Sequence, residues 1–284
     1  MKLSRAIENF WELKSAEVAS KETMRYYKPK LSMIKRYLGD YPVSKINKQV
    51  IAKFTNDQKI RNPKISPKTL NKYRNIIVRI IKDTTGRKID INKIRESRTM
   101  IKSITEENIK KILLYYKSNI NKFYNLKYYL IINIFLDTGV RISELVNIKI
   151  SNINLERRSI YLDVTKTDVG RTIFFTTKTK EILVDYLQNF SETKKYLFPG
   201  DNPSGHIGQK TIYESLIRLQ KRLKIKQSIS PHKWRHTCAK RLMNVGGSTR
   251  FVQKILGHTE LSTTQMYLQY NNDEIKSMYD SLLS

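Results

Sequence analysis

Two segments in the C-terminal part of the chain hold residue types that could carry out chemistry on a phosphate. His232 and Arg235 are three positions apart, so they would share one face of a helix. His258 follows a Leu-Gly pair, and Tyr267 comes nine residues later. Arginine and histidine can bind and protonate phosphate oxygens, and a tyrosine hydroxyl can attack phosphorus. A complete site would also need a second arginine, an acid for the leaving group and a surface for nucleic acid.

The stretch TGVRISEL, residues 138–145, could supply the second arginine. Gly139 permits a tight turn, and either Ser143 or Thr138 could cap the helix that follows. Arg141 would then lie where a turn meets a helix N-terminus, and backbone N–H groups there also favour an anion. Taken alone, the segment fits a surface arginine in a helix cap equally well.

A predicted β-hairpin could supply the acid. Residues 159–163 alternate between apolar and polar, residues 171–175 have the pattern of a partner strand, and Lys166 falls in the turn between them. A lysine on such a hairpin can reach into a site and donate a proton. In so lysine-rich a chain a lysine at a hairpin tip is also expected by chance, and Lys178 is the alternative.

The charge of the chain indicates a polyanionic partner. Among 284 residues there are 54 Lys+Arg and 25 Asp+Glu, a net charge of +29. Residues 1–95 alone hold 24 Lys+Arg against 8 Asp+Glu, so the basic excess is densest there. Such a surface binds polyanions, most commonly nucleic acid. An overall bias towards Ile, Asn and Lys could explain part of the excess.

Several protein classes are disfavoured by composition. The single cysteine, Cys238, excludes an internal disulfide and a cysteine-based zinc site. The N-terminal residues lack the apolar core of a signal peptide, and the longest apolar stretch, residues 128–136, is too short to span a membrane. We therefore expect a cytoplasmic protein, associated with the nucleoid or, for a mobile element or virus, in the host cytoplasm.

Apolar periodicity predicts two domains. Residues 1–90 form a small helical domain, with its last helix opened by Ser66-Pro67. Residues 91–99 are predicted as a linker, and residues 100–284 as a second domain that begins with a capped helix near residue 105. Four basic residues of the helix after Pro67 could contact DNA phosphates, although a charged helix face is often only solvated: Lys68, Lys72, Arg74 and Arg79.

The motifs occur in a characteristic order: T-G-x-R-x-S-E-L at 138–145, Lys166, H-x-x-R-H at 232–236, L-G-H at 256–258, and Tyr267. This pattern resembles the tyrosine recombinases, a family of phage-type integrases and Xer-type recombinases. The resemblance covers nearly the whole chain. It implies a mainly α fold with a small antiparallel β-sheet or hairpin. A helical core-binding domain would clamp DNA, and an α+β catalytic domain would follow it.

The resemblance also implies roles for the matching positions. Arg141 and Arg235 would clamp the non-bridging oxygens of the scissile phosphate. Guanidinium suits this role because its planar donors pair two oxygens and keep their charge. Tyr267 would be the nucleophile, giving a 3′-phosphotyrosine and a free 5′-hydroxyl. Tyr270, three residues further on, is the rival nucleophile.

The remaining positions would handle protons and support the site. Lys166 would be the general acid for the leaving oxygen, and His232 would assist proton transfer at the tyrosine. His258 would hydrogen-bond the phosphate or hold the pocket, and Glu144 would buttress the site.

Three other side chains are assigned to packing or surface positions. His236 is predicted to be a packing or hydrogen-bonding residue, on the argument that the helix turns it away from the face of His232 and Arg235. His206 is predicted to be a plain surface histidine, and Trp234 to lie in the core.

The implied function is site-specific DNA recombination through a Holliday junction, as integration and excision or as dimer resolution, without metal, ATP or another cofactor. The alternatives are DNA relaxation of the type IB topoisomerase kind and a catalytically silent DNA-binding protein. The implied partners are double-stranded recombination sites, accessory proteins, and copies of the same chain in a tetramer on DNA, with a monomer when free. The amphipathic segment 272–284 could pack on its own domain or exchange between protomers.

Overall fold

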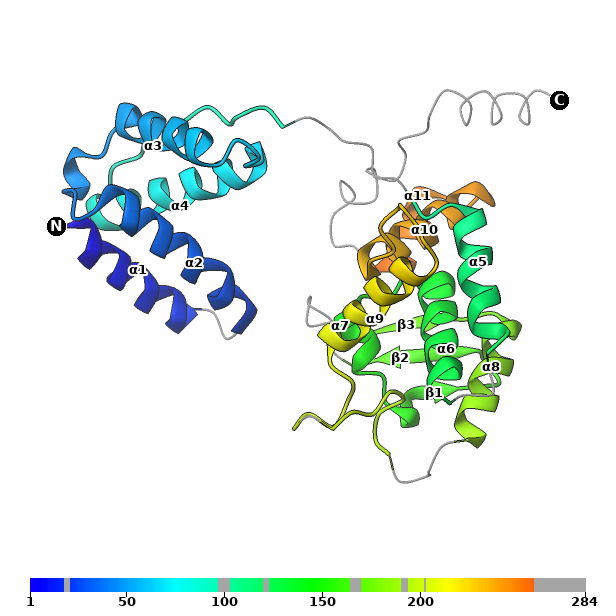
Figure 1. Ribbon diagram of the computed structural model, residues 1–284. Helices are drawn as coiled ribbons and strands as arrows, with labels where there is room; N and C mark the ends of the chain where they lie inside the picture. The colour runs from blue at the N-terminus through cyan, green and yellow to red at the C-terminus, as the bar shows by residue number, and fades with distance from the viewer. Residues whose placement is uncertain are drawn as a thin grey trace. The chain divides into compact units, whose positions relative to one another are not determined.

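The computed structural model describes residues 1–17, 21–96, 103–119, 123–163, 170–189, 194–201 and 203–257. The chain divides into two units, Met1–Thr99 and Met100–Ser284, each drawn in Figure 1. Each unit has its own buried apolar cluster. Within the described ranges, the helices are all too short or too polar to cross a membrane.

The first unit is helical. Its core is formed by apolar side chains from every helix, among them Phe10, Ile34, Phe54 and Ile77. Its elements are α1 (Leu3–Glu17), α2 (Lys21–Leu38), a 3₁₀ turn (Val43–Lys45), α3 (Lys48–Arg61) and α4 (Pro67–Thr85).

Helix α4 begins where its sequence predicts. The Ser66 hydroxyl accepts a hydrogen bond from the backbone N–H of Thr69, and Pro67 occupies the first turn. The helix ends at Gly86, whose φ of 70° is accessible to glycine without steric cost.

Part of the segment predicted to be a linker lies against the first unit. The side chain of Asn71 on α4 donates to the carbonyl of Ile94 at 2.9 Å and accepts from the N–H of Ile94 at 3.0 Å. It also donates to the Glu96 carboxylate at 3.1 Å. Residues 91–96 therefore continue the first unit, and the predicted boundary at residue 90 falls too early for them.

The second unit combines helices with a small sheet. This agrees with the predicted class, mainly α with a small antiparallel sheet, which is confirmed. Its elements are α5 (Glu106–Lys117), α6 (Phe123–Thr138), α7 (Ile142–Val146), a 3₁₀ turn (Ile150–Asn152), β1 (Ile153–Asn154), β2 (Ser159–Leu162), β3 (Arg171–Phe174), α8 (Thr177–Gln188), α9 (Gln209–Arg222), α10 (Pro231–Asn244) and α11 (Thr249–Leu256).

The sheet has the order β1-β2-β3 with antiparallel pairing, and Ile160 lies opposite Ile173. Ile160 and Leu162 are buried while Tyr161 is exposed, so the predicted alternation is confirmed. The two-residue strand β1 was not predicted because so short a segment carries no alternation.

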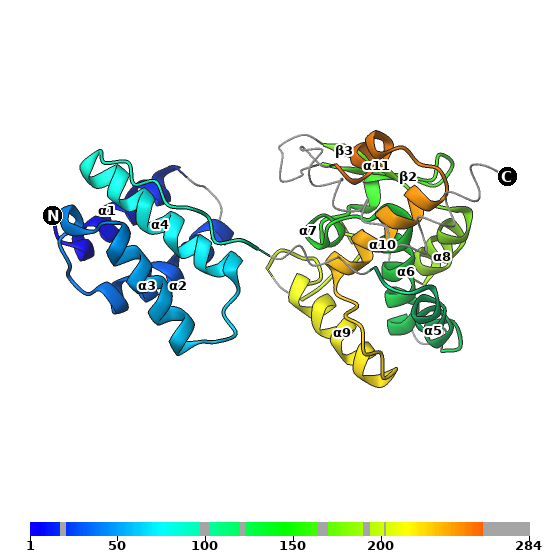
Figure 2. The same ribbon diagram turned by 90° about the horizontal axis from the view of Figure 1, so that it is seen from above.

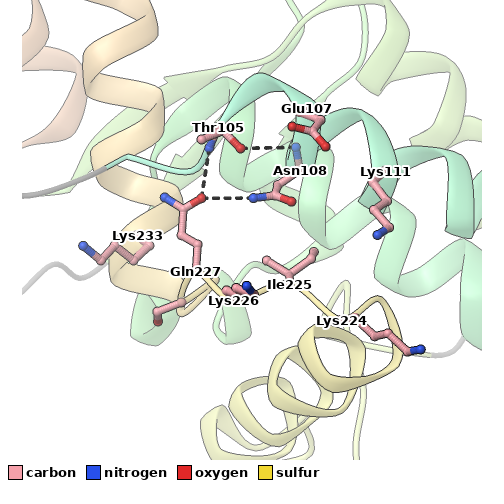
Figure 3. Close-up of a pocket in the computed structure, with 10 residues that line it drawn as sticks. Thr105, Glu107, Asn108, Lys111, Lys224, Ile225, Lys226, Gln227 and Lys233 are labelled. Carbon is pink, nitrogen blue, oxygen red and sulfur yellow. Dashed lines mark hydrogen bonds between the residues drawn. The ribbon is translucent and has the colours of Figure 1, made fainter.

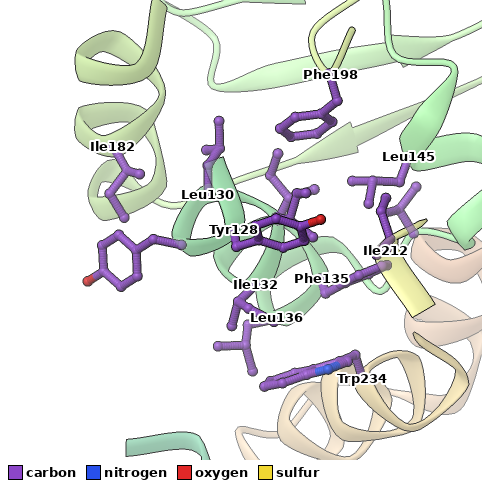
Figure 4. Close-up of a cluster of buried hydrophobic side chains, with 14 of the residues drawn as sticks. Tyr128, Leu130, Ile132, Phe135, Leu136, Leu145, Ile182, Phe198, Ile212 and Trp234 are labelled. Carbon is purple, nitrogen blue, oxygen red and sulfur yellow. The ribbon is translucent and has the colours of Figure 1, made fainter. Parts of the chain in front are cut away.

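Helix α6 forms the centre of the second unit. Apart from Asn133, its residues 128–136 are apolar and all of them are buried, as expected of a helix surrounded by other elements. It contacts α5, α8, α10 and β3. Figure 4 shows its side chains directed towards Ile182 of α8 and Trp234 of α10. The prediction that Trp234 lies in the core is confirmed, and residues 128–136, the longest apolar stretch, lie buried within α6.

Helices α10 and α11 pack through a separate small cluster that includes Cys238, Met243, Val252 and Leu256. Ser248 caps the start of α11, because its hydroxyl accepts from the N–H of Phe251 at 3.2 Å. This packing places the C-terminal end of α11 against the turn that follows α6.

Candidate active site

The turn after α6 brings Arg141 to the start of α7. Gly139 adopts a φ of 56°, and a Cβ atom there would lie 2.5 Å from Cδ2 of Leu256. Only glycine therefore allows both the turn and the close approach of α11. The N–H of Arg141 donates to Oε2 of Glu144 at 2.8 Å, and Nη1 of Arg141 donates to Oε1 of Glu144 at 2.8 Å.

Glu144 provides the cap that the sequence analysis assigned to Ser143 or Thr138, so that prediction was wrong. Ser143 lies exposed within α7, and the Thr138 hydroxyl donates instead to the carbonyl of Ile134 at 2.7 Å. An anion at this helix N-terminus stays a prediction. Helix α7 has only five residues, and the Glu144 carboxylate already takes the Arg141 N–H.

Arg235 is buried at the centre of the site. Its side chain comes from the first turns of α10 and is 4% exposed. Nη1 donates to the carbonyl of Gly139 at 2.7 Å, and Nη2 donates to the carbonyl of Leu256 at 2.6 Å. One guanidinium group thus joins the turn after α6 to the end of α11.

His232 is exposed near the start of α10, one turn from Arg235. The rings of His232 and His236 lie 4.3 Å apart between centroids, at an interplanar angle of 74°. The argument that the helix turns His236 away from His232 was therefore wrong, because residues four apart share a helix face. His236 itself is buried, in agreement with the packing role predicted for it.

His206 is only partly exposed. Its Nδ1 lies 2.8 Å from the carbonyl oxygen of Ile207, and its ring packs edge-on against Tyr196 with centroids 5.3 Å apart. These contacts hold the ring within its loop, whereas a plain surface histidine, as predicted, would make no such contacts.

Three arginines converge on the last carbonyl groups of α11, which have no partner within the helix. Arg171 donates through Nη1 to Ile255, Arg235 through Nη2 to Leu256, and Arg141 through Nη2 to Gly257. The negative end of the helix dipole favours such cations. We call Arg141, Arg171 and Arg235 the arginine cluster; Figure 2 shows α11 beside β3, from which Arg171 comes.

The Glu144 carboxylate is the acidic group that the arginine cluster contacts in the described structure. Oε2 accepts from Nη2 of Arg171 at 2.8 Å, and the residue is only 4% exposed. Burial acts most strongly and raises the pKa of Glu144, but the charge and hydrogen bond of Arg171, together with those of Arg141, lower that pKa below its ordinary value. The carboxylate is therefore ionised at neutral pH.

Three guanidinium groups against one carboxylate leave the cluster with a net positive charge. Arg141 and Arg171 keep 27% and 13% of their side-chain area exposed. A partly buried, positively charged group of planar donors is suited to phosphate oxygens.

Sequence reasoning missed Arg171. It was read only as the first residue of a strand, and its partners lie 27 and 84 positions away in the chain. The spacing of Lys166 and Arg171 around a predicted hairpin was the one local signal that could have drawn attention to it.

Several predicted residues lie outside the described residues: Lys166, His258, Tyr267 and the rival Tyr270. The alternative acid, Lys178, is exposed in the first turn of α8. His258 directly follows Gly257, whose carbonyl Arg141 holds.

A basic cavity of about 800 Å³ lies beside the N-terminus of α5 and the connection from α9 to α10. Figure 3 shows Gln227 at its centre, accepting from the N–H of Thr105 and from Nδ2 of Asn108, both at 3.2 Å. Four lysines line it, with Glu107 as the acidic residue among the lining side chains: Lys111, Lys224, Lys226 and Lys233.

The four basic residues predicted to contact DNA from α4 do not share one face. Lys68, Lys72 and Arg79 fall on one side of the helix by their spacing. Arg74 instead donates to the side chain of Asn71 at 3.4 Å. Arg79 is paired with Asp83 one turn later at 2.9 Å, which reduces the charge of this face.

Comparison with known proteins identifies the family. The family model described as "Phage integrase family" matches residues 102–274, more than half of the chain. The chain therefore belongs to the phage integrase family, and the predicted relation to the tyrosine recombinases is confirmed.

Two archaeal relatives illustrate the extent of the similarity. Tyrosine recombinase XerA of Saccharolobus solfataricus is 33% identical over 194 residues, which cover 68% of this chain and 60% of that protein. XerA of Pyrococcus horikoshii is 27% identical over 283 residues, covering 96% of this chain and 92% of that protein. Matches to the first of these and to XerA of Pyrococcus furiosus span only about three fifths of each relative's length.

Solved structures share the fold. A crystal structure of XerA recombinase matches with a TM-score of 0.57 and 24% identity over 98% of both chains. The Tn1549 transposon integrase in complex with transposon right end DNA matches with a TM-score of 0.81 and 18% identity over the full length of both.

Proposed function

We propose that this protein is a site-specific DNA recombinase that cuts and rejoins strands through a covalent phosphotyrosine. The observation that carries the proposal is the arginine cluster: three guanidinium groups, from the N-cap of α7, from β3 and from α10, meet at the last carbonyl groups of α11. Two of them, Arg141 and Arg171, also bind the Glu144 carboxylate. Phosphodiester cleavage builds negative charge on the non-bridging oxygens, and preorganised cations stabilise it. Membership of the phage integrase family supports the same reaction.

In the proposed reaction, Arg141 and Arg235 bind the non-bridging oxygens of the scissile phosphate. The hydroxyl oxygen of Tyr267 attacks phosphorus, and the bond from phosphorus to the 5′ oxygen breaks. The tyrosine proton passes towards His232, and Lys166 gives a proton to the departing 5′ oxygen, with Lys178 as the alternative donor.

The phosphotyrosine conserves the energy of the broken bond, so a 5′-hydroxyl from another strand can reverse the reaction without ATP. The guanidinium groups would supply the positive charge that metal ions supply in many phosphoryl-transfer enzymes. Glu144 would hold Arg141 in place, and His258 would hydrogen-bond the phosphate. We therefore propose no cofactor.

The proposed partner is double-stranded DNA, bound by residues 1–90 and by the second unit. Structural neighbours include a lambda integrase dimer bound to a core site and XerH bound to its difH substrate. Lys68, Lys72, Arg74 and Arg79 on α4 are the proposed phosphate contacts of the first unit. Cleavage of two sites and exchange through a Holliday junction would require four copies of the chain, acting where the DNA is, in the cytoplasm.

A nicked suicide duplex that carries a candidate site from the DNA flanking the coding sequence tests the chemistry. The wild-type protein should form a covalent adduct that survives a denaturing gel, and Tyr267→Phe should abolish it. Tyr270→Phe is the matched control and should retain the adduct. An adduct that persists in Tyr267→Phe and disappears in Tyr270→Phe would reassign the nucleophile.

The other outcomes separate the alternatives. Relaxation of supercoiled DNA without strand exchange would indicate a topoisomerase. No adduct with any variant, on cognate and Holliday-junction substrates alike, together with salt-sensitive duplex binding, would indicate a binding protein.

We further propose that segment 272–284 docks on a neighbouring protomer when DNA is bound. Head-to-tail donation between identical chains closes a ring. Removing residues 272–284 should leave cleavage of a single site largely intact and impair tetramer formation. Recombination at the wild-type rate after this truncation would contradict exchange.

A further inference from the structure

Arg171 occupies a junction between three parts of the second unit. It is the first residue of β3 and pairs with Leu162 of β2. Through Nη1 it donates to the carbonyl of Ile255 in α11, and through Nη2 to Oε2 of Glu144 in α7 at 2.8 Å. A strand, the turn motif and the last helix of the described chain are thus joined by one side chain.

The end of α11 is shaped to admit this side chain. Gly257 has a φ of 66°, and a Cβ atom there would lie 2.8 Å from Cδ and 2.9 Å from Nε of Arg171. Any other residue at position 257 would displace the arginine. The absence of a side chain at Gly257 therefore serves both the left-handed turn and the passage of Arg171.

Glu144 divides its carboxylate between two arginines. Oε1 accepts from the Arg141 side chain, while Oε2 accepts from the backbone N–H of Arg141 and from Arg171. Because Arg171 neutralises part of the carboxylate, the charge of Arg141 is less compensated than in an isolated Arg–Glu pair. Losing Arg171 would lower the charge of the cluster by one and leave Oε2 with the backbone N–H of Arg141 as its remaining donor among these contacts.

We propose that Arg171 is a positioning residue of the cleavage site: it fixes Glu144, and through it Arg141, while anchoring the C-terminal end of α11. This rests on the proposed recombinase function. Arg171 acts through its neighbours, and its second effect is to keep positive potential at the phosphate. Side chains that orient the ligands of a metal site change its activity by about 10- to 100-fold when removed, and we expect a loss of the same order for a side chain that orients Arg141.

Single-turnover adduct formation tests the effect on the reaction. Arg171→Gln should slow adduct formation by about 10- to 100-fold, with duplex affinity within about threefold of wild type. Arg171→Lys keeps the charge with one donor group and should recover part of the rate. Arg157→Gln, which changes an exposed arginine in the turn between β1 and β2, is the matched control and should behave as wild type.

A substrate with a neutral methylphosphonate at the scissile position separates positioning from folding. A neutral linkage needs less positive charge, so the gap between Arg171→Gln and wild type should shrink to about threefold or less. An equal loss on both linkages would overturn the proposal, because a variant that is merely misfolded is impaired on every substrate.

Hydrogen exchange of the protein without DNA tests the anchoring independently of activity. Arg171→Gln should speed exchange about tenfold in α7 and in the last turn of α11, and leave α8 unchanged. Unchanged exchange in α7 and α11 would overturn the inference even if the enzyme is active. A wild-type protein that forms no adduct, by contrast, contradicts the proposed function, while exchange still decides whether Arg171 holds these elements.

Discussion

The buried guanidinium of Arg235 donates to the carbonyl of Gly139, 96 positions earlier in the chain, at 2.7 Å. The same group donates to the carbonyl of Leu256, so two segments depend on one fork of donors. The position of this side chain is thus set by backbone atoms of the turn after α6 and of the end of α11.

Arg235→Lys should lower both activity and stability. Lysine has one charged nitrogen, so it cannot reach both carbonyls in the geometry of the fork. We expect adduct formation to fall by about 100-fold or more, and the free energy of unfolding by about 1–3 kcal/mol. Urea denaturation and the suicide duplex measure the two effects.

Arg241→Lys is the control for that substitution. Arg241 is exposed on the same helix and pairs with Glu106 at 3.6 Å. Exposed pairs contribute about 0–1 kcal/mol, so this variant should resemble wild type. Equal activity and stability of Arg235→Lys and Arg241→Lys would contradict the importance of the two hydrogen bonds that the buried guanidinium of Arg235 donates.

Gly139→Ala should destabilise the second unit and disturb the cluster. The left-handed backbone costs about 1–2 kcal/mol for a residue with a Cβ. The contact at 2.5 Å with Leu256 adds an overpacking cost of about 1–3 kcal/mol. Gly246→Ala is the control, because Gly246 has a φ of 87° and an added Cβ there would meet nothing within 4 Å. In thermal denaturation this variant should show only the cost of the left-handed backbone. Equal losses of stability in the two variants would show that α11 can move away from a Cβ at position 139 at no cost.

Glu144 should make stability depend on pH in the acid range. Its folded pKa is lowered, so its stabilisation is fully present above the unfolded pKa, about 4.3. That stabilisation is lost as pH falls through the folded pKa. Glu144→Gln should therefore be less stable than wild type at pH 7, and the difference should narrow below about pH 4.3. Urea unfolding at several pH values measures the free energy of unfolding of both proteins. A difference between them that does not change with pH would contradict a stabilising role for the ion pairs of Glu144.

Neutralising the lysine-lined cavity should weaken DNA binding uniformly across sequences. If Lys224 and Lys226 each neutralise one phosphate, changing both to Gln should make the dependence of log affinity on log salt weaker. The magnitude of its negative slope should fall by about 2. The control is the double change of Lys110 and Lys117, which are exposed on α5 and do not line the cavity. Filter binding at several salt concentrations measures the slopes, and equal slopes for both doubles would exclude the cavity from the interface.

Local signals in the sequence predicted much of the fold. Helix α4 begins after Ser66 with Pro67 in its first turn, because a serine cap and a proline act within a few residues. Strands β2 and β3 follow from alternation alone. The cap of α7 was predicted wrongly, since Ser143 and Thr138 are good caps by type while the acid of the capping box, Glu144, was not considered for that role.

The assembly of the site was less predictable. Arg141 and Arg235 were nominated by motif, but that they and Arg171 hold three successive carbonyls is a tertiary relationship. In a chain with 54 Lys+Arg, one further arginine on a strand has no local signal. Its role depends on Glu144 and Ile255, which are distant in sequence.

The convergence of Arg141, Arg171 and Arg235 on residues 255–257 has a consequence for biosynthesis. Translation runs from the N-terminus, so the strongly basic residues 1–95 with their proposed DNA contacts are made before the arginine cluster. The carbonyls that hold the three arginines together, at residues 255–257, are made after all three arginines. Prematurely terminated products that end before α11 would therefore keep the proposed DNA contacts of the first unit while lacking the arrangement proposed to cut DNA.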